Sequence, residues 1–491
     1  IQVSENGGES WRKIPVTALG LAPRTFVNDI KADLFDANTV YVALDNHKEG
    51  DFNPYLFKST DKGQSWQSIS GNIPDRTLVW RMVQDPVKKN LLFAATEFGI
   101  YTSLNGGTSW QKLGGAPTIS FRDLTIQKRE NDLVAASFGR GFFVLDDYSA
   151  LREFTEDNLS QKGKLFTPRT AKWFVPRSNI GNTGADYYFA KNPTYGAVFT
   201  YHLADEYQTS KEVRKEKETS LNKNKADIPF PGWDALDAER QEKAAQVVLS
   251  IQDSQGNVIN KISQKASQGS HRMAWNFSHF NPYSISDSPS SYRGGGALAK
   301  PGTYQASLSL VQNGEVTPLD GPISFEVKAL REGVLKGISH EEYNAYLTEI
   351  TQVYKSISAV RDVLSESGKM HKAMVTALAQ AKILPGTLEP KLEALKLDLT
   401  RINQSISGSP SRREVGERNP AGIQSFLSNA MVGLRNSYGP TPLHKKSLKI
   451  AKELLVQLRA EVKSISEVRI PEIEAALKAA DAPYILGQGI E

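Results

Sequence analysis

The sequence of 491 residues contains no cysteine. Disulfide bonds, thiolate metal sites and cysteine nucleophiles are therefore excluded. The chain also lacks any apolar run near the roughly 18 residues that a membrane-spanning helix needs, so no transmembrane span is expected. A Gly-rich phosphate loop, a Ser-His-Asp order and a His-Glu-x-x-His motif are missing as well, so the sequence indicates no cofactor and no metal.

A strong excess of charge of one sign is missing too. The chain has 59 lysines and arginines against 54 aspartates and glutamates, and the two signs are interspersed along it. This mixed surface differs from the basic stripe of nucleic-acid-binding proteins, so no nucleic-acid partner is expected. The hydrophobic share of 39% is typical of a globular protein, and a chain of this length is expected to form about three domains.

What the chain does contain is an octet, Ser-x-(Asp/Asn)-x-Gly-x-Ser-Trp, that occurs at residues 4–11, 59–66 and 103–110. Internal repeats of this kind indicate solenoids, propellers or arrays. The spacing between the second and third copies matches one four-stranded propeller blade of about 40–45 residues.

Each octet predicts a tight hairpin turn. The Asp or Asn side chain bonds the backbone amides of its own turn, and the Gly supplies a positive φ. The Trp opens the next strand and is expected to bury a large apolar surface. The residues expected in these structural roles are Asn6 and Trp11 in the first copy, Asp61, Gly63 and Trp66 in the second, and Asn105, Gly107 and Trp110 in the third.

The octet resembles the Asp-box, or BNR repeat, of sialidases, sortilin-type receptors and xyloglucanase-type glycoside hydrolases. In those families the box is a structural turn away from the active centre, so the resemblance implies a β-propeller without fixing an activity. The runs at 45–47, 96–99 and 138–147 extend the resemblance. The whole order of segments is similar to the C-terminal half of a large family of exported bacterial proteins, labelled sortilin-like or BNR-repeat glycosyl hydrolases. This implies an extracytoplasmic protein of the periplasm, the outer-membrane surface or the medium.

Short β-rich runs divide residues 1–154 into blades. Two units of four runs are separated by Gly, Pro, Asn and Asp; a third unit at 121–147 lacks the octet, and residues 1–14 hold only the last half of an earlier blade. Three and a half blades do not close a ring and would expose strand edges. We therefore expect N-terminal blades on a further segment of the same gene or on a separate chain, which is the first expected partner.

The remaining chain predicts three further parts. Residues 155–180 are expected to be a connector that contains strands near Leu165 and Trp173, and residues 181–330 an Ig-like β-sandwich. Within it, a Lys- and Glu-rich insert at 207–245 is expected to be partly helical, and a Ser-, Gly- and Tyr-rich insert at 281–299 to be a long loop. From 338 to 485 the hydrophobic period changes from 2 to 3.6, which predicts an antiparallel helical bundle.

Two sequence signals mark helix starts in that last region. Residues 339–342, Ser-His-Glu-Glu, form a capping box, in which Ser and Glu satisfy each other's backbone amides. Thr441 followed by Pro442 is an N-cap with proline at the first helical position.

Candidate chemical residues lie in the turns between the second and third strands of each blade. Antiparallel strands place successive turns at opposite ends of a sheet, so these turns gather at the end away from the octets. The candidates are Asp45, Asp51 and Glu97 as catalytic carboxylates, and His47 and Arg140 as ligand-binding residues. Glycoside hydrolysis needs two carboxyl groups about 5–9 Å apart. The other interpretation is that these carboxylates cap turns or pair with Arg140 between blades.

Two functions therefore remain open. The main prediction is an exported propeller that binds protein or glycan, as a scaffold or docking subunit of a cell-envelope assembly. It is preferred because no two residues of the sequence are required to act as a catalytic acid and base. The alternative is a glycoside hydrolase acting on a polysaccharide, with its site shared with the N-terminal blades. Whether the chain is an enzyme is left undecided by the sequence.

Overall fold

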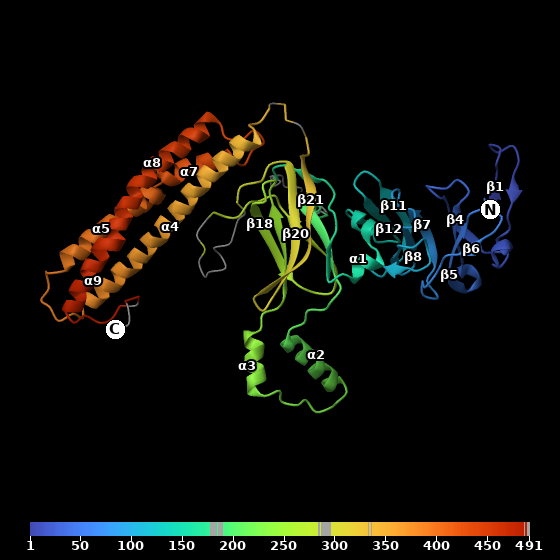
Figure 1. The fold of residues 1–491 in the computed structure, drawn as a ribbon, viewed down its shortest axis with the longest axis horizontal. Helices are drawn as coiled ribbons and strands as arrows, with labels where there is room; N and C mark the ends of the chain where they lie inside the picture. The colour runs from blue at the N-terminus through green and yellow to red at the C-terminus, as the bar shows by residue number, and fades with distance from the viewer. Residues whose placement is uncertain are drawn as a thin grey trace. The chain divides into compact units, whose positions relative to one another are not determined.

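The computed structural model describes residues 1–491 except 177–183, 185–189, 283–284, 286–295, 332, 335, 486 and 489–491. The chain divides into two compact units. The first, built of β-sheets, comprises Ile1–Ala171, Tyr188–Trp275 and Thr303–Glu326; the second, largely helical, comprises Lys172–Tyr187, Asn276–Gly302 and Val327–Glu491 (Figure 1).

The N-terminal part of the first unit consists of antiparallel sheets in which each strand pairs with the next one along the chain. The first sheet contains β3 (Phe26–Ala32), β4 (Val40–Asn46), β5 (Asp51–Ser59) and β6 (Gln67–Ser68); the second contains β7 (Val79–Gln84), β8 (Leu92–Thr96), β9 (Gly99–Ser103) and β10 (Gln111–Lys112); the third contains β11 (Phe121–Gln127), β12 (Asp132–Ser137) and β13 (Phe142–Leu145). Ahead of them β1 (Gln2–Val3) pairs with β2 (Arg12–Lys13). The strands predicted from the β-rich runs are confirmed.

Strand β8 explains why one of these runs is apolar throughout. Alternate residues of a strand point to opposite faces of its sheet. Leu92 and Ala94 belong to the core shared with Tyr41 and Leu56 of the first sheet. Phe93 and Ala95, with Leu91, belong to a second core that includes Phe121 of the third sheet. Both faces of the strand are therefore buried, which accounts for the apolar residues from Leu91 to Ala95.

The three octets form the same hydrogen-bonded turn. In each, the amide of the fifth residue donates to the hydroxyl of the first, and the amide of the seventh donates to the Asp or Asn side chain. The first distance is 2.7, 2.8 and 2.8 Å at Gly8, Gly63 and Gly107, and the second is 3.0, 2.9 and 2.9 Å at Ser10, Ser65 and Ser109. The predicted positive φ is confirmed at Gly63 (+81°) and Gly107 (+96°).

Burial of the octet tryptophans differs from the prediction. Trp110 is buried, and its indole nitrogen donates to the carbonyl of Ile69 at 2.8 Å. Trp66 packs in the cluster of Ile14. Trp11, in contrast, is 60% exposed. Ile14 packs with Trp66 and Ile69 with Trp110, and each isoleucine comes three residues after the tryptophan of another octet. Among the described residues, no octet places an isoleucine against Trp11 in this way.

Two further sheets follow the N-terminal sheets along the chain. One has the order β14 (Gly163–Leu165), β16 (Ala197–Leu203), β19 (Gly269–Trp275), and the other the order β15 (Ala171–Trp173), β21 (Glu315–Ala329), β20 (Gly302–Gln312), β17 (Gln246–Gln252), β18 (Val258–Lys265). The sheets meet through the rings of Phe199 and Phe325, 4.9 Å apart. Strands β14 and β15, expected in a connector, are strands of these sheets.

The insert at 207–245 is partly helical, as predicted. Helices α2 (Ser210–Lys223) and α3 (Trp233–Gln241) are joined by Arg214, which pairs with Glu239 at 2.7 Å. The short helix α1 (Glu156–Ser160) precedes β14. The loop predicted at 281–299 lies largely outside the described residues.

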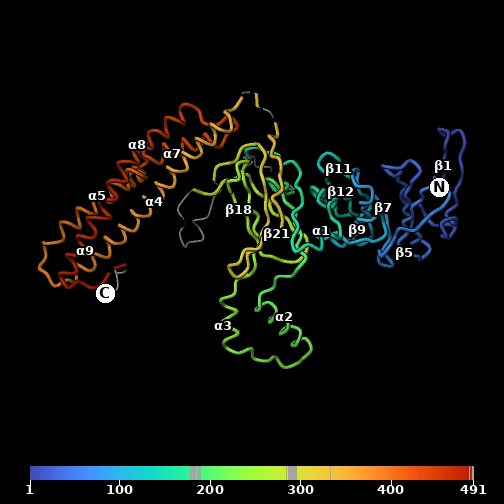
Figure 2. Tube along the Cα trace, in the orientation of Figure 1, coloured from blue at the N-terminus to red at the C-terminus, as the bar shows by residue number. Residues whose placement is uncertain are grey.

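The second unit contains the predicted helices. They are α4 (His340–Leu378), α5 (Glu389–Ser407), α6 (Pro410–Glu414), α7 (Ile423–Val432), α8 (Pro442–Ser464) and α9 (Ile470–Ala479). Helix α4 packs against α5, α8 and α9, and α7 packs against α8 (Figures 1 and 2). The capping box at Ser339 and the N-cap at Thr441 are both confirmed. Among the described residues, no helix combines the length and apolarity needed to cross a membrane.

The octet turn predicts a difference between two neighbouring glycines. A Cβ on Gly107 would lie 2.7 Å from the Cβ of Ile69, whereas on Gly106, also at positive φ, it would meet nothing closer than 3.4 Å. We expect Gly107→Ala to lower the free energy of unfolding by about 3 kcal/mol, since overpacking adds to backbone strain. Gly106→Ala should lower the free energy of unfolding by only about 1 kcal/mol, because it adds backbone strain without overpacking. Chemical denaturation followed by tryptophan fluorescence checks this, and equal losses would contradict it.

Candidate functional site

The first strands of the three N-terminal sheets share an irregularity. The pairing register shifts between Val27 and Asp29 in β3, between Val79 and Arg81 in β7, and between Phe121 and Asp123 in β11. A β-bulge leaves one residue out of the ladder and redirects its side chain. The residues at these bulges are Asn28, Trp80 and Arg122, and all three line the same surface hollow.

Trp80 is the centre of this region. Its indole nitrogen donates to Oε2 of Glu97 at 2.9 Å. The guanidinium carbon of Arg122 lies 3.6 Å from the ring centroid, and the ring of His47 meets it edge-on at 5.8 Å. Trp80 is only 7% exposed. These contacts fix the orientation of a large aromatic side chain at the base of an open surface.

Two open hollows adjoin at Trp80 and share His47, Trp80 and Arg122. One has a volume of about 620 Å³ and is also lined by Arg24, Phe26, Asn28, Asp45, Asn46, Lys48, Glu49 and Arg81. The other has a volume of about 630 Å³ and is also lined by Phe52, Arg76, Leu78, Glu97 and Phe98. We refer to the two together as the Trp80 hollow.

An ion-pair chain holds the strands beneath the hollow. The guanidinium of Arg81 lies 3.1 Å from Asp29 in the first sheet and 3.0 Å from Asp123 in the third. The side chain of Asp29 is only 5% exposed and also accepts the amide of Met82 at 3.2 Å. Because a buried carboxylate is costly without a cation, these charges favour one alignment of β3, β7 and β11.

Local turn chemistry places the other side chains of the hollow. Between β4 and β5 a short 3-10 turn, His47–Glu49, ends at Gly50 with φ +82°. The β8–β9 turn has Glu97 and Phe98 at its tip, closed by the hydroxyl of Thr96, which donates to the carbonyl of Gly99 at 2.8 Å. Both turns lie at the end of the sheets opposite the octets.

The structure brings together three of the predicted site residues. Asp45 and His47 line one hollow and Glu97 the other. Asp45 is buried and hydrogen-bonded to His47. Glu97 accepts from Trp80 and from the hydroxyl of Ser120, each at 2.9 Å. Hydrogen bonds of this kind agree with the interpretation in which the carboxylates hold turns and neighbouring strands. The catalytic assignment stays a prediction.

Two predicted residues lie elsewhere, and others were missed. Asp51 accepts the hydroxyl of Tyr55 at 2.6 Å, and neither Asp51 nor Arg140 lines either hollow. The arginine near Glu97 is Arg122, 4.0 Å away.

Three residues of the hollow, Trp80, Arg122 and Arg76, were not predicted. Aligning the repeats Val-Asn-Asp-Ile, Val-Trp-Arg-Met and Phe-Arg-Asp-Leu, which begin at 27, 79 and 121, provides the signal that would have found the first two.

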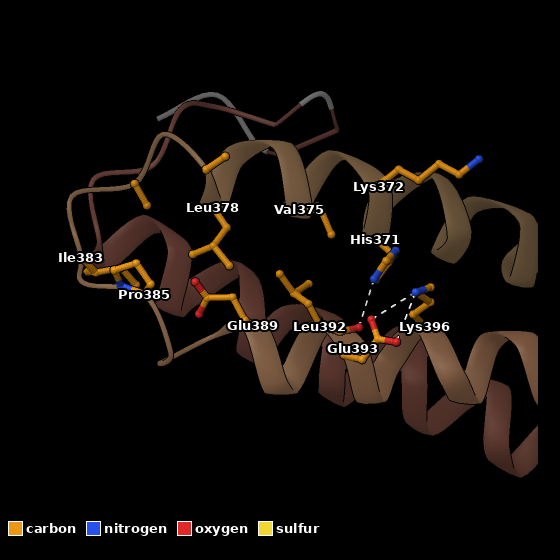
Figure 3. Close-up of a pocket in the computed structure, with 12 residues that line it drawn as sticks. His371, Lys372, Val375, Leu378, Ile383, Pro385, Glu389, Leu392, Glu393 and Lys396 are labelled. Atoms are coloured by element: carbon orange, nitrogen blue, oxygen red, sulfur yellow. Dashed lines mark hydrogen bonds and ion pairs between the residues drawn. The ribbon is translucent and has the colours of Figure 1, made fainter.

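A separate hollow of about 650 Å³ lies between α4 and α5 in the second unit (Figure 3). Its polar side chains are engaged within the bundle. Nε2 of His371 donates to the carbonyl of Leu392 at 3.0 Å, Glu393 pairs with Lys396 at 3.2 Å, and Glu389 accepts the amide of Gly386 at 2.8 Å. Throughout the described residues, no group of three or more metal-ligating side chains occurs.

Comparison with known proteins finds partial likenesses, and no family model matches the chain. A xyloglucanase from Paenibacillus sp. is 28% identical over 121 residues, which are 23% of this chain and 11% of that protein. The xyloglucanase Xgh74A of Acetivibrio thermocellus is 29% identical over 102 residues, 18% of this chain and 12% of that protein. The chain thus spans about a tenth of the length of these curated relatives.

Solved structures give likenesses of the same kind. A GH74 enzyme of Niastella koreensis has 18% identity and a TM-score of 0.21, over 30% of this chain and 24% of that one. The GH74 xyloglucanase of Xanthomonas campestris has 12% identity and a TM-score of 0.21, over 60% and 38%. The chain is weakly similar, over part of its length, to GH74 xyloglucanases, and the sortilin-like part of the predicted resemblance stays a prediction.

The ion-pair chain predicts unequal effects of two substitutions. Arg81→Gln leaves the buried Asp29 without its closest cation, so we expect the free energy of unfolding to fall by about 2 kcal/mol. The side chain of Asp123 is 57% exposed, so Asp123→Asn should cost less than about 1 kcal/mol. Urea denaturation of both variants measures the difference. Equal losses would show that the chain of charges does not fix the strands.

Proposed function

We propose that this chain provides a polysaccharide-binding surface in a glycoside-hydrolase-type protein. In this proposal the three N-terminal sheets are blades of an Asp-box β-propeller, an Ig-like sandwich follows them, and the Trp80 hollow is the ligand-binding rim. The observation that carries it is the exposure of three phenylalanines that line the hollow. Phe26, Phe52 and Phe98 are 61%, 40% and 46% exposed.

Exposed phenylalanines are informative here because they gather. A single apolar side chain on a surface needs no explanation, whereas a cluster around a concave site marks an interaction surface. Phe26 begins β3, Phe52 follows the first residue of β5, and Phe98 lies in the β8–β9 turn, so all three lie at one end of the sheets. Sugar rings have apolar faces that pack on aromatic rings, and hydroxyl edges that need polar partners.

Polar partners are present between the rings. Asn28, Asn46 and His47 line the same hollow as Phe26, and Glu97 lines the same hollow as Phe52 and Phe98. Amide, imidazole and carboxylate groups together can donate to and accept from sugar hydroxyls. The weak similarity to xyloglucanases supports a polysaccharide over other ligands with apolar faces.

Hydrolysis is the second candidate function. Asp45 and Glu97 occupy the same place in successive sheets, each directly after the residue that pairs with Val27 or Val79. A carboxyl group from each of two neighbouring sheets is what a glycosidase needs. The names of the curated relatives favour this candidate over a scaffold. The scaffold or docking role and the envelope partners stay predictions, and the extracytoplasmic location is part of this proposal.

The binding proposal is tested with phenylalanine variants. Phe52→Ala and Phe98→Ala should each weaken binding by roughly tenfold, because each removes a stacking surface from the hollow. Phe35→Ala is the matched control, since Phe35 is 45% exposed but lines neither hollow. The measurement is affinity electrophoresis against xyloglucan and polygalacturonate. Binding to neither polysaccharide, or equal effects of all three substitutions, would overturn the proposal.

The hydrolysis candidate is tested separately. If Glu97 acts on the substrate, Glu97→Gln should lower the release of reducing sugar by roughly a hundredfold or more, while the melting temperature changes little. Asp51→Asn should leave the rate unchanged, because Asp51 bonds Tyr55 and lines neither hollow. A chain that binds polysaccharide without releasing sugar would exclude hydrolysis and leave the binding proposal intact.

A further inference from the structure

We propose that the Trp80 hollow selects an acidic polysaccharide, whose sugar carboxylates are bound by Lys48, Arg76 and Arg122. This inference rests on the proposed polysaccharide binding and adds the chemical class of the ligand. It starts from the charges that line the hollow, which are five lysine or arginine side chains and three carboxylates.

Pairing within the protein leaves the positive charges in excess. Arg81 is engaged by Asp29 and Asp123, and Arg24 lies 3.7 Å from Glu49. No ion pair found among the described residues involves Lys48 or Arg76. Arg122 approaches Glu97 only to 4.0 Å, with 43% of its side chain exposed.

The carboxylates of the hollow do not cancel this excess. Asp45 is buried and hydrogen-bonded to His47. Oε2 of Glu97 accepts hydrogen bonds from Trp80 and Ser120. A ligand therefore meets cations at the surface and carboxylates that are already held. In a concave site, charges of one sign concentrate ligands of the opposite sign.

Each of the three cations lies over an aromatic ring of the hollow. Nζ of Lys48 is 5.9 Å from the centroid of Phe26, Cζ of Arg76 is 5.9 Å from that of Phe52, and Cζ of Arg122 is 3.6 Å from that of Trp80. The combination of ring and cation thus recurs along one end of the sheets. A sugar packed on such a ring brings a carboxylate on its edge toward the cation beside the ring.

Recurrence of this pair suits a polymer that carries a carboxylate on each sugar. Guanidinium groups bind carboxylates through two parallel hydrogen bonds, and these bonds are stronger than those between neutral groups. A neutral polysaccharide has aromatic surface to pack on but no group that matches the cations. The hollow is therefore better matched to a uronic-acid polymer than to a neutral glucan.

Arg76 provides an independent observation. Its backbone has φ +62°, in the left-handed region that glycine adopts without strain and other residues adopt with strain. Strained positions of this kind cluster at functional sites. An arginine at this position is explained by a need for its guanidinium beside Phe52, because the local backbone favours a glycine.

The test compares polygalacturonate with its methyl ester, which has the same backbone without the charge. Affinity is measured by isothermal titration calorimetry on the full chain, at low ionic strength and at about 1 M sodium chloride, where the Debye length is about 3 Å. We expect the wild-type protein to bind the acid form at least roughly tenfold more tightly than the ester, and salt to remove most of this difference.

Three variants locate the effect. Arg122→Gln and Arg76→Gln should each lower affinity for the acid form by roughly tenfold and leave affinity for the ester unchanged. Arg76→Gly should lower binding equally while the melting temperature stays the same or rises, since the strain is relieved. Lys58→Gln is the matched control, because Nζ of Lys58 also lies over a ring, 5.7 Å from that of Tyr41, but lines neither hollow.

Three results would overturn this inference. One is equal affinity for acid and ester, another is unchanged binding in both arginine variants, and the third is tighter binding of oligodeoxythymidylate than of polygalacturonate. If xyloglucan binds and polygalacturonate does not, the inference fails while the proposed function holds. If no polysaccharide binds, both fail.

Discussion

The guanidinium of Arg81, placed between carboxylates of two neighbouring sheets, is the interaction on which the candidate site depends. Asp29 is almost fully buried, so a register in which it lost this partner would leave its charge with Lys31 alone, 3.5 Å away. The adjoining positions are the bulges that carry Asn28, Trp80 and Arg122. Holding β3, β7 and β11 in one alignment thus also brings three side chains from distant parts of the sequence to one surface.

The parts of the fold that could be predicted are those whose physics is local. The hydrogen bonds that the Ser hydroxyl and the Asp or Asn side chain accept from amides of the octet lie within eight residues, and the capping boxes at Ser339 and Thr441 lie within four. The candidate site is different, because it combines residues about fifty positions apart. A bulge has no clear signature in the sequence of a single strand. The sequence therefore predicts Arg140 as a ligand-binding residue, whereas the arginine of the third sheet that lines the hollow is Arg122. Strands β14 and β15 were assigned to a connector because their sheet partners follow much later in the chain.

The sheets carry the octet turns at one end and the Trp80 hollow at the other. At one end, side-chain oxygens of the octets accept backbone amides and fix tight turns. At the other, aromatic rings, an imidazole and cations surround Trp80. Antiparallel pairing keeps these two ends apart, so the motif that identifies the repeat lies far from the residues proposed to bind ligand.

The three bulges have a consequence for how such a surface diversifies. Asparagine, tryptophan and arginine occupy equivalent places, although these side chains share neither size, charge nor shape. The residue at a bulge lies outside the hydrogen-bonded ladder. Strand pairing therefore restricts the type of residue there less than it does at the neighbouring positions. Each repeat therefore contains one position at which a single codon change can alter the chemistry of the surface while the scaffold is inherited intact. Duplicated repeats could in this way acquire new specificities one residue at a time.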